Sequence, residues 1–161
     1  MSEEVWDTQL DLNLKTAFLG CKYVLPVMEQ QGSGAIVNVS SVAGKLASPL
    51  TSPYCMTKHA VEAFTISLRG ELAPHGIDVC KVNPGPYNTG FNDRMVDGIT
   101  EHIAAGDEAT HATNQVIREL VLTDQLDPHE VVVALADLAE AERIATTHLL
   151  EAIHYRSLDR G

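Results

Sequence analysis

The sequence predicts an α/β fold with a parallel sheet, and three consecutive segments carry that prediction. Residues 34–41 form a short β-branched run ending in Asn-Val-Ser-Ser, typical of a buried strand that enters a loop. Residues 53–75 have apolar side chains at helical spacing, and residues 77–82 form a second β-branched run before Asn-Pro-Gly-Pro. A strand, a helix and a strand in this order form a βαβ unit with parallel strands and a right-handed crossover.

A further helix is predicted before the first strand. Apolar residues recur at helical spacing from Leu10 to Leu25, and the turn at residues 31–34 ends the helix. Asn13 shares this apolar stripe, where a buried amide must be hydrogen-bonded; an asparagine facing water is an equally good interpretation of the residues alone. In the helix over residues 53–75 the expected apolar stripe is Ala60, Ala63, Phe64, Ser67, Leu68 and Leu72.

The remainder of the chain is less regular. Residues 86–126 predict a loop leading into a short helix, with scattered glycines that suggest a mobile excursion. The segment Asp127-Pro128 has the N-cap and first-turn proline of a helix start, so a helix is expected over residues 131–142. Residues 145–155 fit either a strand or a helix.

Candidate site residues come from three segments. Tyr54 and Lys58 stand four residues apart, so the phenol and the ammonium share one helix face, and the cation favours the phenolate. Alone, such a pair is more often a surface tyrosine beside a solvated lysine. Ser41 follows the first predicted strand and Pro84-Gly85 follow the second. Ligands bind beyond the carboxyl ends of parallel strands, so these residues are expected to meet there.

With these motifs the sequence resembles the short-chain dehydrogenases/reductases. The similarity runs from about Trp6 to Thr89 and extends more weakly to about Glu140. The matching motifs are Leu12-Asn13-Leu14, Ile36 to Gly44, the Tyr54/Lys58 pair, and Val82 to Gly85 followed by Thr89. The resemblance implies a partial Rossmann-like, doubly wound parallel sheet with flanking helices. The whole chain, residues 1–161, would be the C-terminal portion of one NAD(P)-binding domain, with residues 86–126 as its substrate-loop region.

The resemblance also implies residue roles. Tyr54 would be the general acid/base, Ser41 would bind the substrate carbonyl, Lys58 would lower the pKa of Tyr54, and Asn13 would hold a water beside Lys58. The cofactor, NAD or NADP, would contact Tyr54, Lys58, Pro84, Gly85 and Thr89. The implied activity is the interconversion of an alcohol and a ketone or aldehyde.

The chain departs from the family pattern at its beginning. It contains no Gly-rich turn to receive a cofactor pyrophosphate, so it corresponds to the C-terminal half of the fold. An alternative function follows from this difference: a catalytically incompetent fragment that acts only as a folding or dimerisation module. Tyr87, Phe91 and Met95 are candidate walls of a substrate pocket, and a packed loop core explains them equally well.

Composition narrows the possible partners and locations. A net charge of −11 disfavours nucleic acid and anionic membranes as partners, and no apolar run is long enough to span a bilayer. Histidines and cysteines lack metal-site spacing, so no metal is expected, and a cytoplasmic location is predicted. The resemblance implies a homodimer or homotetramer assembled through the helices that carry Asn13 and Tyr54, with Val24, Val61 and Ile66 facing outward.

Overall fold

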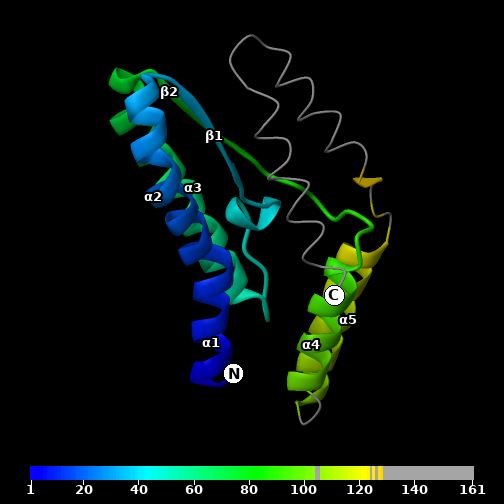
Figure 1. Cartoon of the computed structure of the whole chain (residues 1–161). Helices are drawn as coiled ribbons and strands as arrows, with labels where there is room; N and C mark the ends of the chain where they lie inside the picture. Colours follow the sequence, from blue (N-terminus) through cyan, green and yellow to red (C-terminus); the bar gives the residue numbers. More distant parts are fainter. Residues whose placement is uncertain (104–105, 124, 126, 129–161) are drawn as a thin grey trace.

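A computed structural model describes residues 1–103, 106–123, 125 and 127–128 (Figure 1). Its elements in chain order are α1 (Glu3–Leu10), the π-helical turn η1 (Asp11–Lys15), α2 (Thr16–Gln31), β1 (Gly34–Val39), the 3-10 turn η2 (Val42–Gly44), α3 (Ser52–Leu72), the 3-10 turn η3 (Ala73–His75), β2 (Ile77–Val82), α4 (Phe91–His102) and α5 (Glu108–Leu122). The predicted helix at 131–142 and the segment at 145–155 lie outside the described residues.

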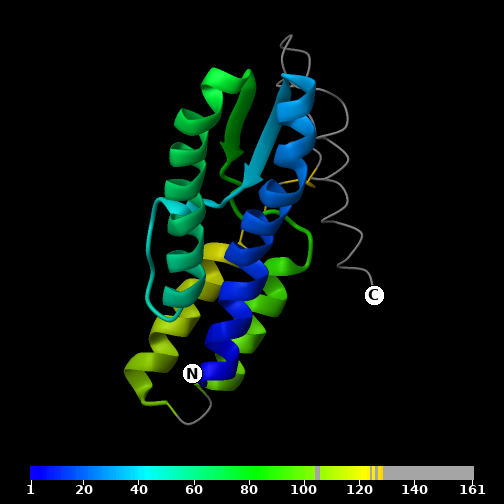
Figure 2. The same ribbon diagram turned by 60° about the vertical axis from the view of Figure 1, so that its left-hand side comes forward.

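The sheet consists of β1 and β2, which pair in parallel from Gly34 opposite Ile77 to Val39 opposite Val82. α2 packs against β1 and α3 packs against β2, and both helices cover the same face of the sheet (Figures 1 and 2). α1, η1 and α2 run as one continuous helix, because the residues that join them all keep right-handed helical backbone angles. The predicted α/β class with a parallel sheet is confirmed.

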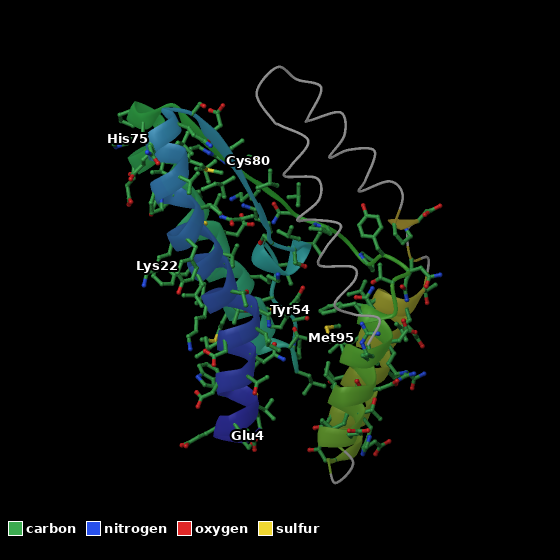
Figure 3. All side chains as sticks on the ribbon, in the orientation of Figure 1. Glu4, Lys22, Tyr54, His75, Cys80 and Met95 are labelled. Atoms are coloured by element: carbon green, nitrogen blue, oxygen red, sulfur yellow. The ribbon has the colours of Figure 1, made fainter. Side chains whose placement is uncertain are left out.

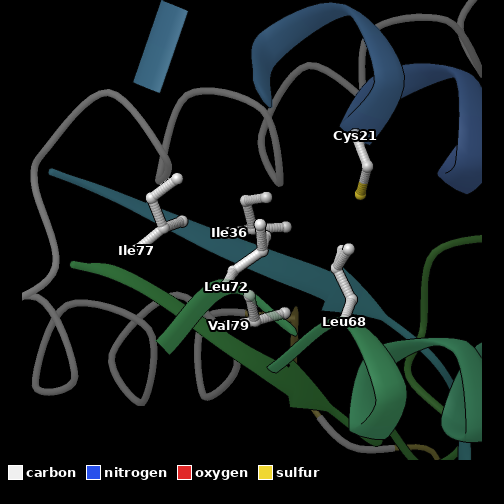
Figure 4. Packing of buried hydrophobic residues seen from close by; sticks show 6 residues of the cluster. All are labelled: Cys21, Ile36, Leu68, Leu72, Ile77 and Val79. Atoms are coloured by element: carbon white, nitrogen blue, oxygen red, sulfur yellow. The ribbon is translucent and has the colours of Figure 1, made fainter. Parts of the chain in front are cut away.

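The core lies between this pair of helices and the sheet. Its buried residues come from α2, α3 and both strands: Cys21, Ile36, Leu68, Leu72, Ile77 and Val79 (Figure 4). Burial of these side chains is the main favourable contribution to folding of this unit. The Arg69 guanidinium adds a hydrogen bond of 2.6 Å from its Nε to the carbonyl oxygen of Val79, which ties the end of α3 to β2.

The buried face of α3 differs from the predicted stripe. Ala63 and Ser67 are exposed, whereas Val61 and Thr65 are buried, so the outward position expected for Val61 is wrong at 1% exposure. The outward position expected for Val24 is wrong too, because Val24 is half-buried and packs against the core. Burial of Thr65 is possible because its hydroxyl donates to the Val61 carbonyl at 2.7 Å and accepts from Asn38 Nδ2 at 3.0 Å. A threonine that satisfies its own hydroxyl in this way packs like an apolar residue.

Two glycines shape the turns that precede the strands. Gly32 ends α2 and Gly76 ends η3, and both have left-handed backbone angles, with φ of 69° and 71°. A Cβ on Gly76 would lie 2.7 Å from the carbonyl oxygen of Gly32, so the two turns touch through their backbones. This contact brings the starts of β1 and β2 together.

In residues 86–126 the expected loop leading into a helix is present, since α4 begins at Phe91, but the second helix, α5, was not predicted. α5 begins at Asp107, whose carboxylate accepts the Thr110 N–H at 2.8 Å. Val96 of α4 and Ile117 of α5 are buried, and Asn114 Nδ2 donates to Thr100 Oγ1 at 2.9 Å. The many polar residues of this segment lie on the solvated faces of an amphipathic hairpin.

Candidate active site

The N-terminal half of α3 carries Tyr54 and Lys58 on one face. The Lys58 ammonium lies 5.7 Å from the centre of the Tyr54 ring, on which it makes a cation–π contact. The same ammonium donates a hydrogen bond of 3.1 Å to the carbonyl oxygen of Val39. Phe91, the first residue of α4, packs its ring 5.9 Å from that of Tyr54 (Figure 3 labels Tyr54). Tyr54 is therefore placed between a cation and the start of the α4–α5 hairpin.

Burial sets the charge state of Lys58. Removal of the ammonium from water lowers the pKa of Lys58 from its ordinary value of 10.5 to about 8. Desolvation acts in this direction because it disfavours the charged form. Near neutral pH the side chain stays mostly protonated, and it can exchange its proton at moderately alkaline pH.

Ser41 lies directly beyond the carboxyl end of β1, and the end of β2 holds it there. Its hydroxyl oxygen caps η2 by accepting the Ala43 N–H at 3.1 Å. Its carbonyl oxygen accepts from Asn83 Nδ2 at 2.8 Å. The next residue, Val42, donates its N–H to the Pro84 carbonyl at 3.0 Å. Residues 40–44, here called the serine loop, and the Pro84-Gly85 turn thus lie together beyond the carboxyl ends of the two strands, as the βαβ prediction required.

Asn13 occupies the middle of the π-helical turn η1, which packs against α3. Its side-chain Nδ2 donates to the carbonyl oxygen of Gln9 at 3.1 Å and to Gln9 Oε1 at 2.9 Å. These two bonds satisfy the half-buried Asn13 amide nitrogen within its own helix. Single π-turns inside α-helices are frequent at functional sites.

Thr89 stands at the start of α4. Its hydroxyl accepts the Phe91 N–H at 3.4 Å, and its own N–H donates to the Tyr87 carbonyl at 2.9 Å. Thr89 is linked to the site through Phe91, whose ring contacts Tyr54.

An ionic cluster that the sequence patterns did not predict surrounds Glu62, one helical turn after Lys58 on α3. Glu62 of α3 is 5% exposed, and its Oε2 contacts Lys45 Nζ at 2.6 Å and also Lys81 Nζ. Its Oε1 accepts from Asn83 Nδ2 at 2.6 Å. Sequence spacing places Glu62 one helical turn after Lys58 on the same helix face, but it does not show that the carboxylate is buried.

Burial alone would raise the pKa of Glu62, but hydrogen bonds outweigh it. Those from Lys45, Lys81, Ser40 and Asn83 favour the carboxylate and hold the pKa well below its ordinary value of 4.5. Glu62 is therefore ionised at neutral pH. No group of three potential metal ligands occurs in the part of the chain that the structure describes.

Fold and site together define the class: a Rossmann-like α/β protein with a tyrosine–lysine pair at the carboxyl edge of its parallel strands. A family model described as short chain dehydrogenase matches residues 1–99. The chain belongs to the short-chain dehydrogenase/reductase family, whose members are oxidoreductases.

Individual relatives agree with this assignment. The human dehydrogenase/reductase SDR family member 4 is 45% identical over 92 residues, which cover 57% of this chain and 33% of the relative. The uncharacterized oxidoreductase YusZ of Bacillus subtilis is 34% identical over 139 residues, covering 84% of this chain and 49% of the relative. The chain thus spans half or less of the length of these relatives.

Solved structures give the same result for the fold. A 3-oxoacyl-(acyl-carrier protein) reductase with bound NAD from Brucella melitensis aligns with a TM-score of 0.54 and 31% identity, over 75% of this chain and 46% of that one. An acetoin dehydrogenase from Enterobacter cloacae aligns with a TM-score of 0.54 and 35% identity, over 58% and 38% of the two chains. In the described residues, no helix has the length and apolarity required to cross a bilayer.

Proposed function

We propose that this protein is an NAD- or NADP-dependent oxidoreductase that interconverts an alcohol with a ketone or aldehyde. The observation that carries the proposal is the placement of Tyr54 beside Lys58, with Lys58 bonded to the last residue of β1 and Ser41 directly beyond that strand. Family membership supports the reaction type. The partner would be a small carbonyl or alcohol compound and not a nucleic acid.

In the proposed reaction Tyr54 moves the proton on the substrate oxygen. During reduction its phenol donates a proton to that oxygen, and during oxidation its phenolate accepts the proton. The nearby Lys58 ammonium stabilises the phenolate. Ser41 would donate a hydrogen bond to the same oxygen. Asn13 would help to keep a water beside Lys58, through which the site exchanges protons with solvent.

The residues present fit the nicotinamide end of such a cofactor. An ammonium has three N–H donors, and the bond to Val39 uses one, so Lys58 retains donors suited to ribose hydroxyls. Pro84, Gly85 and Thr89 would border the nicotinamide. When bound, the nicotinamide supplies or accepts the hydride. NAD and NADP share this end, and the Brucella relative with bound NAD shows that one similar protein takes NAD.

We also propose that the chain self-associates as a homodimer or homotetramer through α2 and α3. Support comes from large apolar side chains on the solvated sides of both helices: Phe18, Tyr23, Val27 and Ile66. Ile66, at 57% exposure, faces outward as expected for such an interface. Sedimentation velocity at micromolar concentration tests this proposal, and a single species with the mass of one chain would contradict it.

The reaction is tested with the protein as expressed, assayed with NAD(H) and NADP(H) against a panel of secondary alcohols, ketones and aldehydes. Nicotinamide absorbance reports turnover in either direction. The expected result is turnover with one cofactor that depends on Tyr54. A folded protein that neither binds nor turns over either cofactor would contradict the proposal and favour the alternative, a folding or dimerisation module.

A further inference from the structure

One carboxylate joins four segments behind the candidate site. Glu62 lies on α3, and its two oxygens contact Lys45 just after η2, Lys81 on β2, and Asn83 just after β2. The Ser40 hydroxyl donates to the Lys58 carbonyl on the same helix at 3.4 Å.

Asn83 carries this network to the serine loop. Its side-chain nitrogen donates both to Glu62 Oε1 at 2.6 Å and to the Ser41 carbonyl at 2.8 Å. An amide nitrogen has two hydrogens, so these two bonds use its full donor capacity. The orientation of Asn83 is thereby fixed from both sides. The Ser41 backbone is thus joined to α3 through two consecutive hydrogen bonds.

α3 is also the helix that carries the proton-transfer group. Tyr54, Lys58 and Glu62 follow one another at intervals of four residues, so they lie on one stripe of that helix. The loop packs tightly on this stripe: a Cβ on Gly44 would lie 2.6 Å from Ser40 Oγ and 3.0 Å from Glu62 Cγ. Glu62 therefore contacts the loop and lies on the same helix stripe as Tyr54, so a shift of the loop relative to Tyr54 would disturb the contacts of Glu62.

We propose that Glu62 and Asn83 are positioning residues that fix Ser41 relative to Tyr54, and this inference rests on the proposed function. A buried ion pair is by itself weak support for stability, because apolar side chains of similar volume often stabilise equally well. Directional bonds from Glu62 to three segments outside its helix do what apolar packing cannot: they define where the Ser41 backbone lies. Catalytic groups must be held within a fraction of an ångström, so loss of this network lowers turnover more than binding.

The test uses Glu62→Gln, which keeps an acceptor for Asn83 but places an amide against the ammonium groups of Lys45 and Lys81. The second variant is Asn83→Leu, which removes both N–H donors of the Asn83 side chain and replaces it with one of similar size. This variant provides the test if Glu62→Gln does not fold. Glu71→Gln is the matched control, because Glu71 is an exposed glutamate on the same helix.

Amide hydrogen exchange provides a readout that does not depend on activity. The reporter is the Val42 N–H, bonded to Pro84, and the reference is the Cys55 N–H, bonded to Thr51 at 2.9 Å near the start of α3. In Glu62→Gln and Asn83→Leu the ratio of Val42 to Cys55 exchange rates should rise at least 10-fold. In Glu71→Gln it should stay within threefold of wild type.

Kinetics provide the second readout. At saturating cofactor and substrate, kcat should fall at least 10-fold in both network variants, while the dissociation constant of the cofactor stays within threefold. An unchanged exchange ratio in both variants, or a changed ratio with kcat within threefold, would overturn the inference. If the wild-type protein shows no cofactor-linked turnover, the proposed function fails, and the exchange ratio alone decides whether the network fixes Ser41.

Discussion

The Lys58 ammonium donates a hydrogen bond of 3.1 Å to the carbonyl oxygen of Val39, the last residue of β1. This bond ties α3 to the strand that leads into Ser41. It also explains how a lysine is kept close to the Tyr54 ring when its burial disfavours the charge. The relationship has measurable consequences for titration and for rate.

Lys58 is predicted to titrate at about pH 8 in the folded protein, because burial lowers its pKa. Since the folded pKa lies below the ordinary value of 10.5, the unfolded chain binds this proton first as the pH falls. The resulting cost to stability is present in full below about pH 8 and is relieved as the pH rises towards 10.5. NMR of the Lys58 Nζ and Cε nuclei gives the midpoint, and Lys58→Met supplies the assignment. A midpoint above pH 10 would show that the ammonium is not desolvated.

Tyr54→Phe removes the transferable proton and retains the ring that packs on Phe91. In the protein as expressed, kcat should fall by about 10²–10⁴-fold, the usual contribution of a positioned acid/base. Tyr23→Phe is the control, because Tyr23 is 71% exposed on α2. Steady-state turnover of Tyr54→Phe within threefold of wild type would rule out the assigned role.

Leu68→Ala should lower the free energy of unfolding by about 2–5 kcal/mol, through lost burial and the cavity left in the core. Leu120→Ala, at a position with 69% exposure on α5, should change it by less than about 0.5 kcal/mol. Urea unfolding followed by circular dichroism measures both values. Equal effects of the two substitutions would mean that the core described between α2, α3 and the sheet is misplaced.

Substituting alanine for two of the glycines should change the stability of the fold in opposite directions. Gly76→Ala forces a side chain into a left-handed conformation and against the Gly32 carbonyl, at a cost of about 1–2 kcal/mol or more. Gly70→Ala lies within α3 with open space around it and should stabilise the helix by about 0.5–1 kcal/mol. Thermal unfolding of both variants distinguishes them, and destabilisation by Gly70→Ala would contradict the placement of α3.

Local patterns were sufficient to predict the strands and the edge at which the site residues meet. The β-branched runs and the turns after them predicted β1, β2 and the meeting of the loop at Ser41 with the turn after β2, which the bond from Val42 N–H to the Pro84 carbonyl shows. The predicted apolar stripe of α3 differed from its buried face. Alanine fits either face of a helix, and Thr65 can be buried because its hydroxyl is hydrogen-bonded within the helix. The pairing of α4 with a second helix, α5, was not predicted, because polar residues outnumber the narrow apolar stripe through which the two helices pack.

The ionic cluster depends on contacts that sequence spacing cannot specify. Lys45 and Lys81 lie 36 residues apart, and only the folding of three segments around Glu62 brings them together. A lone glutamate on a helix is usually solvated, so its burial could be recognised only from its neighbours.

The π-helical turn around Asn13 holds one residue more than an α-helical turn would. An i→i+5 turn takes up its extra residue within one wider turn, so η1 avoids the rotation of about 100° that an added residue would give to a regular α-helix. α1 contacts α3, the helix that carries Tyr54. Deleting one residue from Asp11–Lys15 is expected to close this turn to a regular α-helical one and to leave the same face of α1 against α3. The extra residue therefore changes the backbone only around Asn13, and its consequence is the position of that side chain rather than the direction of the helix.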